Sequence, residues 1–300
     1  MAGKLVWVDG EMVDWADATF HVSSFGLHYG IGFFEGIRCH ETPDGPAIFR
    51  LDDHVRRLER SAAIYGVSLP YDSAVIAEAC KKVVRENDLT DCYVRPVAFL
   101  GEGRNPLVAP FHVAVMASED GPLIGPPKTA GVNARISSFE RFTPNSIPNA
   151  AKATGQYLNS FLAEVEALRT GSDEALLMNA SGQVADGWAH NVFIVSDGTV
   201  LTPPTSSGAL PGITRDSIMV LGHEGGLRVA EKILVRSDLY VAEECFLTGT
   251  AAGVVPVVSV DGRQIGTGQS GAVTNRLSDL LDAVTSGKVA DHAEWRSYIQ

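Results

Sequence analysis

Hydrophobic and polar positions alternate along the first residues of the chain, and the alternation is interrupted at one tight turn. Residues 5–13 alternate around Asp9-Gly10. This pair tolerates a positive φ and so favours a short connection between two strands. The pattern predicts that the chain opens with a β-hairpin.

After a break at 43–46, the apolar positions take the period of a helix. The first predicted helix is expected to be capped by Asp52 or Asp53, and its apolar side chains recur at helical spacing, namely Val55, Leu58, Ala62 and Tyr65. A second helix is predicted at about 72–86. Strands are predicted at 92–100 and 111–117.

Residues 119–129 concentrate glycine, proline and acidic residues without periodicity, which is typical of a linker between domains. We therefore predict a small N-terminal α+β domain at 1–118 and a large C-terminal α+β domain at 130–300. The C-terminal part should hold an amphipathic helix at 155–169, a helix after Pro211-Gly212, and strands at 132–138, 174–178, 191–195, 199–202, 244–247 and 254–260. Separate helices among antiparallel strands indicate the α+β class.

Composition excludes several classes of protein. The chain has 300 residues, 45% of them hydrophobic and 20% charged, which is ordinary for a globular protein. No apolar run approaches the roughly 18 residues that cross a bilayer. A net charge of −12 without a dense basic tract argues against a nucleic-acid partner.

The N-terminus and the cysteines both favour the cytoplasm. The first residues lack the uninterrupted apolar core of a signal peptide. The four cysteines, Cys39, Cys80, Cys92 and Cys245, form no CxxC pair and have no histidine at zinc spacing. We expect them to be reduced and packed in the core, with neither a disulfide nor a metal ion.

Lys152 is the lysine whose surroundings in the sequence carry no charge. Burial would lower the pKa of its amine and give a nucleophile that forms a Schiff base with an aldehyde, as in pyridoxal phosphate enzymes. Taken alone, a lysine in this setting would more often lie over a helix start with its ammonium in water.

Two segments could bind the phosphate of such a cofactor. In LPGITRDS, Gly212, Ile213 and Thr214 stand at a predicted helix start, where free N–H groups attract an anion. In LTGTAAG, small residues and hydroxyls follow a strand, around Gly249 and Thr250. A Pro-Gly pair before a helix is also ordinary capping chemistry, so the coexistence of both segments with Lys152 carries the argument.

Tyr93 and Arg95 are two positions apart on a predicted strand and project from one face, which would suit a substrate carboxylate. An exposed sheet face could carry the same pair. Tyr29 and Phe34 could form the wall of an apolar pocket or belong to the core. Spacing alone leaves these alternatives open.

Together these motifs are similar to those of fold type IV pyridoxal phosphate aminotransferases, and most of all to the branched-chain amino acid aminotransferase group. The matching segments follow the family order along nearly the whole chain: HYG and FEGIR at 28–38, IFR at 48–50, YVRP at 93–96, AAKATGQYLNS at 150–160, TPP at 202–204, LPGITR at 210–215 and TGTAA at 248–252.

The resemblance implies a set of roles around pyridoxal 5'-phosphate. Lys152 would bind the cofactor covalently and shuttle a proton, and Tyr157 would hydrogen-bond its phenolic oxygen. Asp186 would contact the pyridine nitrogen, where the family usually has a glutamate. The positions that match phosphate binding are Arg50, Ile213, Thr214 and Thr250, with Gly212 and Gly249 shaping the turns.

The resemblance also implies where substrates bind. The matching positions are Tyr29, Phe34, Gly36, Arg38, Tyr93, Arg95, Ala251 and Ala252, with Arg95 as the expected partner of the glutamate γ-carboxylate. The family completes this pocket across a dimer interface, so a homodimer is implied.

The implied activity is a ping-pong transfer of the amino group of branched-chain L-amino acids to 2-oxoglutarate. Within the same fold, a D-amino acid transaminase, an R-selective amine transaminase and an aminodeoxychorismate lyase remain open. The alternative outside enzymes is a dimer that binds the cofactor without catalysis.

Overall fold

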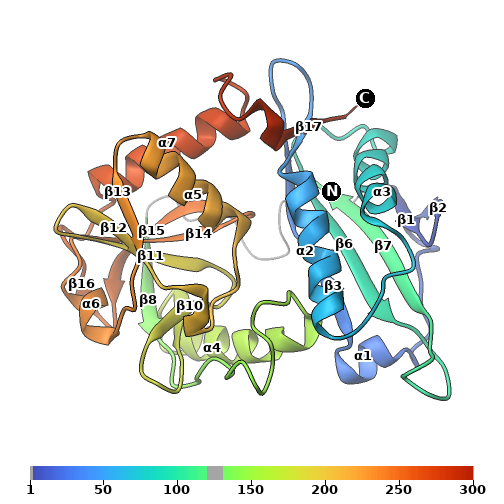
Figure 1. Ribbon diagram of the computed structural model, residues 1–300, viewed down its shortest axis with the longest axis horizontal. Coiled ribbons are helices and arrows are strands. Elements are labelled where there is room, and N and C mark those ends of the chain that lie inside the picture. The colour runs from blue at the N-terminus through green and yellow to red at the C-terminus, as the bar shows by residue number, and fades with distance from the viewer. Residues whose placement is uncertain (1–2, 120–130, 300) are drawn as a thin grey trace. The chain divides into compact units, whose positions relative to one another are not determined.

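The computed structural model describes residues 3–119 and 131–299, which form two compact units (Figure 1). Unit 1 holds the N-terminal part together with Ala151–Gly155 and the C-terminal segment from residue 283. Unit 2 holds the described residues up to Ala150 and Gln156–Asp282. The predicted division at 1–118 and 130–300 remains a prediction. Its linker at 119–129 lies outside the described residues, apart from Glu119.

Unit 1 is built on one antiparallel sheet. Its strand order is β17-β5-β4-β6-β7-β1-β2, with β3 pairing β6. The strands are β1 (Leu5–Val8), β2 (Glu11–Asp14), β3 (Gly32–Phe34), β4 (Ile37–His40), β5 (Ala47–Phe49), β6 (Cys92–Leu100), β7 (Phe111–Ser118) and β17 (Arg296–Tyr298).

The predicted N-terminal hairpin is confirmed. Strands β1 and β2 pair in register from Leu5 opposite Asp14 to Val8 opposite Glu11. Asp9 and Gly10 join them with φ values of 47° and 104°. Because both turn residues have positive φ, the turn follows the right-handed twist of the strands.

The helices of unit 1 are α1 (Phe25–Tyr29), α2 (Leu51–Ile64) and α3 (Ser73–Glu86), followed near the C-terminus by the short helix η3 (Ala293–Trp295). Apolar side chains of α2 and α3 form one core with the sheet strands. Asp72 caps α3 by accepting from the N–H of Val75 at 2.9 Å. The predicted cap of α2 is wrong: Arg50, in the left-handed region, precedes the helix, and Asp52 and Asp53 lie in its first turn.

Unit 2 is built on a mixed sheet. Its strand order is β10-β9-β8-β15-β14-β11-β12-β13, with β16 pairing β15, and the pairs β8 with β9, β8 with β15, and β12 with β13 are parallel. The strands are β8 (Val132–Ile136), β9 (Glu174–Met178), β10 (Val184–Gly187), β11 (Asn191–Ser196), β12 (Thr199–Thr202), β13 (Arg228–Glu231), β14 (Glu244–Gly249), β15 (Gly253–Val260) and β16 (Arg263–Gln264).

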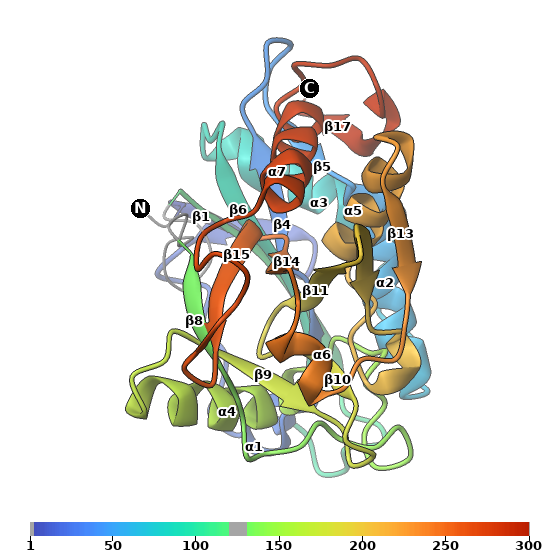
Figure 2. The same cartoon turned by 90° about the vertical axis from the view of Figure 1, so that its left-hand side faces the viewer.

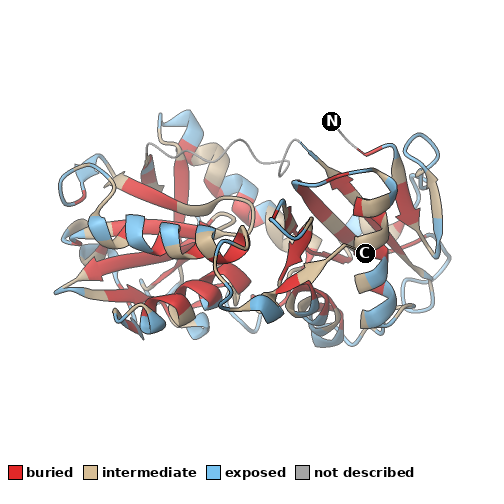
Figure 3. Cartoon of the chain, turned by 90° about the horizontal axis from the view of Figure 1, so that it is seen from above, coloured by how far each residue is buried: buried red, intermediate tan, exposed pale blue. Residues whose placement is uncertain are grey.

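Helices cover this sheet. Figure 2 shows α4 running along β9, where Ala163 and Ala167 pack on Ala175 and Leu177. In both units the buried residues gather on the strands and on the inner faces of the helices (Figure 3). The helices are η1 (Thr154–Gln156), α4 (Tyr157–Arg169), η2 (Thr205–Ser207), α5 (Ile213–Glu224), α6 (Arg236–Tyr240) and α7 (Ala272–Thr285). Separate helices beside two sheets confirm the α+β class.

Helix α4 differs from its predicted amphipathic character. Its buried face carries small or polar residues, Asn159, Ser160, Ala163 and Ala167. The large apolar side chains of Leu158 and Phe161 are instead 71% and 61% exposed. The period of the pattern is therefore helical, but it does not show which face is buried within the chain.

All four cysteines are buried. In the part of the chain that the structure describes, no helix combines the length and apolar character needed to cross a membrane.

A buried charged cluster, which we call the Glu35 cluster, comprises Glu35, His54 and Arg57 in the core of unit 1. The carboxylate of Glu35 accepts from Nε and Nη2 of Arg57 at 2.6 and 2.7 Å, and its Oε2 lies 2.7 Å from Nδ1 of His54. Burial raises the pKa of Glu35, but the charges of Arg57 and His54 more than offset this and hold it well below its usual range. Burial lowers the pKa of His54. Arg57 is therefore the main charge that keeps Glu35 ionised.

We expect Glu35→Gln to lower the free energy of unfolding by about 3 to 5 kcal/mol, because it leaves the buried guanidinium of Arg57 without its counter-charge. Since the folded pKa of Glu35 is lowered, its stabilisation is present above the ordinary carboxyl pKa of 4.5 and is lost as the pH falls below that value. Urea denaturation at steps between pH 2.5 and pH 8 measures both effects.

Glu78→Gln is the matched control, because Glu78 pairs with Arg85 at 3.3 Å on the exposed surface of α3. It should change the free energy of unfolding by less than about 1 kcal/mol. Equal effects of the two substitutions would show that the Glu35 cluster adds nothing beyond a surface ion pair.

Candidate functional site

The segment that carries Lys152 is fixed to unit 1 through its backbone. The N–H of Lys152 donates to Oγ of Ser61 on α2 at 2.9 Å, and its carbonyl accepts from the N–H of Phe34 at 3.1 Å. Thr154 Oγ1 donates to the carbonyl of Gly30 at 2.7 Å. The side chain of Lys152 is half-buried, with Nζ 5.0 Å from the centre of the Phe34 ring.

The Glu35 cluster belongs to the same neighbourhood, and the sequence did not reveal it. Ser61, which holds the Lys152 backbone, donates its hydroxyl to the carbonyl of Arg57 at 2.7 Å. The charge of Lys152 also contributes to the lowered pKa of His54. The available signal was the acid Glu35 inside the apolar run IGFFEGI.

Tyr93 and Arg95 do project from one face of β6, as predicted. Nη2 of Arg95 donates to the hydroxyl of Tyr93 at 2.9 Å, and the guanidinium lies 4.6 Å from the ring centre of Phe34. A Cβ on Gly36 would lie 1.7 Å from the Tyr93 hydroxyl, so only glycine leaves this space. Among the described residues, the buried Nε of Arg95 has no hydrogen-bond acceptor. An anionic ligand would supply one.

Two other predicted substrate residues have different surroundings. Arg38 on β4 forms an ion pair with Asp91. Tyr29 on α1 is 68% exposed, and its ring stacks on Phe25 at 5.8 Å. In the register of β4 with β6, Arg38 stands directly opposite Tyr93, whereas the contact of Tyr29 places its ring beside Phe25.

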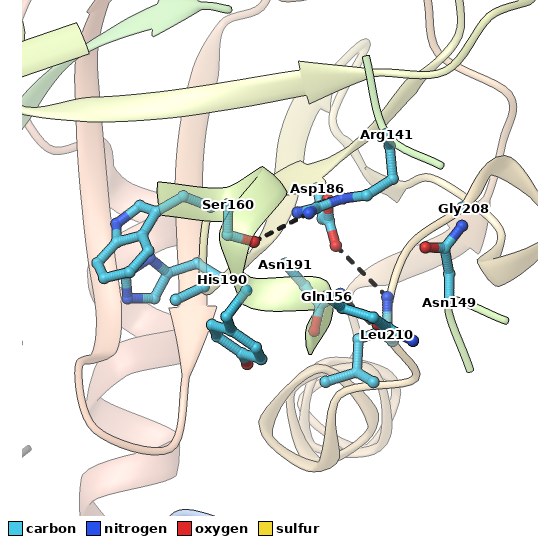
Figure 4. Close-up of a pocket in the computed structure, with 12 residues that line it drawn as sticks. Arg141, Asn149, Gln156, Ser160, Asp186, His190, Asn191, Gly208 and Leu210 are labelled. Carbon is cyan, nitrogen blue, oxygen red and sulfur yellow. Dashed lines mark hydrogen bonds and ion pairs between the residues drawn. The ribbon is translucent and has the colours of Figure 1, made fainter. Parts of the chain in front are cut away.

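Unit 2 contains a cavity, shown in Figure 4. It receives side chains from the segment before Lys152, from the start of α4, from β10 and from the loops that follow. The lining residues are Arg141, Asn149, Gln156, Tyr157, Ser160, Asp186, Trp188, Ala189, His190, Asn191, Gly208 and Leu210. The structure thus brings two of the predicted cofactor residues, Tyr157 and Asp186, to one cavity.

Asp186 on β10 is buried and paired. Its Oδ1 accepts from both Nε and Nη2 of Arg141, at 2.9 and 2.7 Å. Within the described residues, its Oδ2 has a single long contact, 3.4 Å from the N–H of Leu210. Burial raises the pKa of Asp186, and Arg141 opposes that rise. Oδ2 can therefore take a cationic N–H donor.

The two predicted phosphate segments also belong to unit 2. Gly212 precedes α5 and no side chain caps that end among the described residues, so the first N–H groups of the helix are available to an anion. Thr214 Oγ1 lies 3.5 Å from Thr250 Oγ1, which places both segments side by side. Ala251 and Ala252 follow Thr250 and are half-buried.

Close packing explains both glycines of these segments. A Cβ on Gly212 would lie 1.9 Å from Oδ1 of Asn191, and one on Gly249 would lie 2.8 Å from Cδ2 of His190. Any larger residue would displace a side chain that lines the cavity.

Arg50, the predicted phosphate partner from unit 1, already has contacts. Its Nε donates to Asp53 at 2.5 Å, and its guanidinium lies 4.9 Å from the ring centre of Trp295. The role of Arg50 remains a prediction.

Comparison with known proteins identifies the family. Residues 32–260 match the family model described as amino-transferase class IV. The branched-chain-amino-acid aminotransferase of Pseudomonas aeruginosa is 43% identical over 99% of this chain and 97% of its own.

Solved structures agree with this assignment. The Escherichia coli branched-chain amino acid aminotransferase superposes with a TM-score of 0.95 at 42% identity, covering 99% of this chain and 100% of its own. A second enzyme of that name, from the source abbreviated T.th. and complexed with N-(5'-phosphopyridoxyl)-L-glutamate, gives a TM-score of 0.94 at 40% identity, with 99% of each chain covered. The chain described here belongs to the class IV aminotransferases.

Proposed function

We propose that this protein transfers the amino group of branched-chain L-amino acids to 2-oxoglutarate by a ping-pong reaction that depends on pyridoxal 5'-phosphate. The proposal depends most on the setting of Lys152. Its side chain is half-buried, while its backbone N–H is bound to Ser61 and its carbonyl to Phe34. Relatives that are named branched-chain aminotransferases match almost the whole chain, and they support the choice of substrate.

The residues of unit 2 fit this cofactor. Asp186 Oδ2 offers a carboxylate oxygen for the proton on the pyridine nitrogen. The N–H groups of Ile213 and Thr214, with the hydroxyls of Thr214 and Thr250, form a set of donors for the phosphate. Tyr157 lines the same cavity as Asp186 and would donate to the phenolic oxygen. The phosphopyridoxyl compound bound to the T.th. relative supports this fit.

When bound, pyridoxal phosphate supplies an aldehyde for the amino group and a ring that accepts electrons from the Cα–H bond. Lys152 would hold the cofactor through its aldehyde carbon until the substrate amine replaces it. Nζ would then take the proton from the substrate Cα and deliver it to that cofactor carbon, and it would carry a proton in the opposite direction in the second half-reaction. Asp186 would keep the proton on the pyridine nitrogen. The bonds from Ser61 and Phe34 fix the backbone of Lys152, so only its side chain needs to move.

Two kinds of amino donor have to share one substrate site. Phe34 and Tyr93 offer apolar surface to a branched side chain, and the buried Nε of Arg95, without an acceptor among the described residues, offers a donor to the γ-carboxylate of glutamate. Gly36 keeps space beside the Tyr93 hydroxyl. Arg38, Tyr29, Ala251 and Ala252 complete the proposed substrate residues.

We also propose a cytoplasmic homodimer. The apolar face of α4, with Leu158, Phe161 and Leu162 exposed by 71%, 61% and 46%, is the kind of surface that a second copy covers. A partner chain would give Tyr29, exposed on α1, a role in completing a substrate pocket.

The function is tested by single-turnover half-reactions. The pyridoxal form of the purified enzyme is mixed with one amine at a time, and conversion to the pyridoxamine form is followed by absorbance. L-Leucine, L-isoleucine, L-valine and L-glutamate should react at least about 100-fold faster than their D-enantiomers or (R)-1-phenylethylamine, since a mispositioned Cα–H bond costs that much.

Matched lysine variants separate catalysis from binding. Lys152→Ala should abolish conversion with every amine, whereas Lys232→Ala, at an exposed position of unit 2, should react like the parent. A faster reaction with D-amino acids or with the amine would assign the enzyme to another reaction of this fold. Cofactor binding without any conversion would indicate a binding protein.

Arg95→Ala should slow the L-glutamate half-reaction about 10- to 100-fold more than the L-leucine half-reaction, because it removes a charged donor that only glutamate uses. The comparison is the ratio of the two values of kcat/KM. Arg104→Ala, an exposed arginine of the same unit, should leave the ratio unchanged. Equal losses with both substrates would mean that Arg95 supports the fold and does not choose the substrate.

A further inference from the structure

The contacts of Asp186 are unequal between its two oxygens. Arg141 directs two donors, Nε and Nη2, at the same atom, Oδ1. A bidentate arginine would instead place one donor on each carboxylate oxygen. As a result Oδ1 is fully used, while Oδ2 has, within the described residues, only the 3.4 Å contact to the N–H of Leu210. Asp186 and Leu210 both line the cavity (Figure 4).

Arg141 is itself fixed in orientation. Its Nη1 donates to Oδ1 of Asn159 at 3.2 Å and to Oγ of Ser160 at 2.9 Å, both on the first turn of α4. Its Nη2 donates to the carbonyl of Gly187 at 2.9 Å as well as to Asp186. With contacts on three sides, the planar guanidinium cannot rotate without breaking several hydrogen bonds.

One positive charge does not fully offset the burial of Asp186. Burial raises the pKa of this carboxyl and outweighs the opposing effect of Arg141, while the nearby Glu174 raises it further. Glu174 has its own partner, with Oε2 3.1 Å from Nδ1 of His190. A second cationic donor at Oδ2 would therefore favour the ionised form of this carboxyl.

We propose that Arg141 is a positioning residue: it holds Oδ1 of Asp186 so that Oδ2 is the oxygen presented to the protonated pyridine nitrogen of the cofactor. The inference rests on the proposed function. It also explains how a side chain one methylene shorter than the usual glutamate serves this position, because the arginine removes the rotational freedom that would otherwise weaken a short contact.

The alternative is a purely structural arginine that ties the first turn of α4 to β10. The two roles predict a different dependence of cofactor affinity on the ring nitrogen. A positioning role strengthens binding only of a cofactor that has this nitrogen, whereas a structural role acts on every cofactor equally.

The test compares apoenzyme affinities for pyridoxal phosphate and for its analogue with C–H in place of the ring nitrogen, measured by fluorescence titration. The parent should prefer pyridoxal phosphate by about 10-fold or more, because the analogue lacks the charged N–H that would donate to Asp186. Asp186→Asn should bring this ratio close to one, and so should Arg141→Gln. Ser160→Ala, which removes one bond to Nη1, should lower the ratio less. Arg135→Gln, on β8 and outside the cavity lining, should leave it unchanged.

The double variant Asp186→Asn with Arg141→Gln should show the same ratio as Asp186→Asn alone, because Arg141 acts through Asp186. An unchanged ratio in Ser160→Ala and in folded Arg141→Gln would overturn the proposal, as would a parent that binds both compounds equally. A parent that binds neither compound would contradict the proposed function itself, a distinct outcome. If Arg141→Gln fails to fold, the Ser160→Ala ratio decides.

Discussion

The proposed chemistry depends on holding one lysine by its backbone so that its side chain can carry out the reaction. The N–H of Lys152 is bound to Ser61 Oγ and its carbonyl to the N–H of Phe34. Ser61 in turn donates to the backbone carbonyl of Arg57, and the guanidinium of Arg57 pairs with the buried carboxylate of Glu35. The position of the lysine is thus set by helix α2 and strand β3, two parts of one packed core.

Each unit contains a buried carboxylate that is paired with an arginine. A carboxylate without water is unfavourable unless its oxygens find donors. Glu35 receives one donor from Arg57 on each oxygen and is fully satisfied. Asp186 receives both donors from Arg141 on one oxygen. The first arrangement is what a structural ion pair requires, while the second leaves an acceptor for a ligand.

Local patterns predicted most of the fold, and their failures have physical causes. Turn chemistry at Asp9-Gly10 and the period of α3 depend on neighbours in sequence, so both were predictable. The exposed apolar face of α4 was not, because the pattern does not say which face of a helix packs within the chain. Among site residues, Tyr93 and Arg95 share a face as strand geometry requires, but Arg141 and Ser61 matter only through partners far away in sequence. The contact of Arg50 with Trp295 was hidden for the same reason.

The most direct test of the account is the identity of the lysine that carries the cofactor. The holoenzyme is reduced with borohydride, digested, and analysed by mass spectrometry. The account predicts a single phosphopyridoxyl group, on the peptide that contains Lys152. A modified peptide containing any other lysine, or a stoichiometric cofactor that borohydride leaves unattached to the chain, would contradict it.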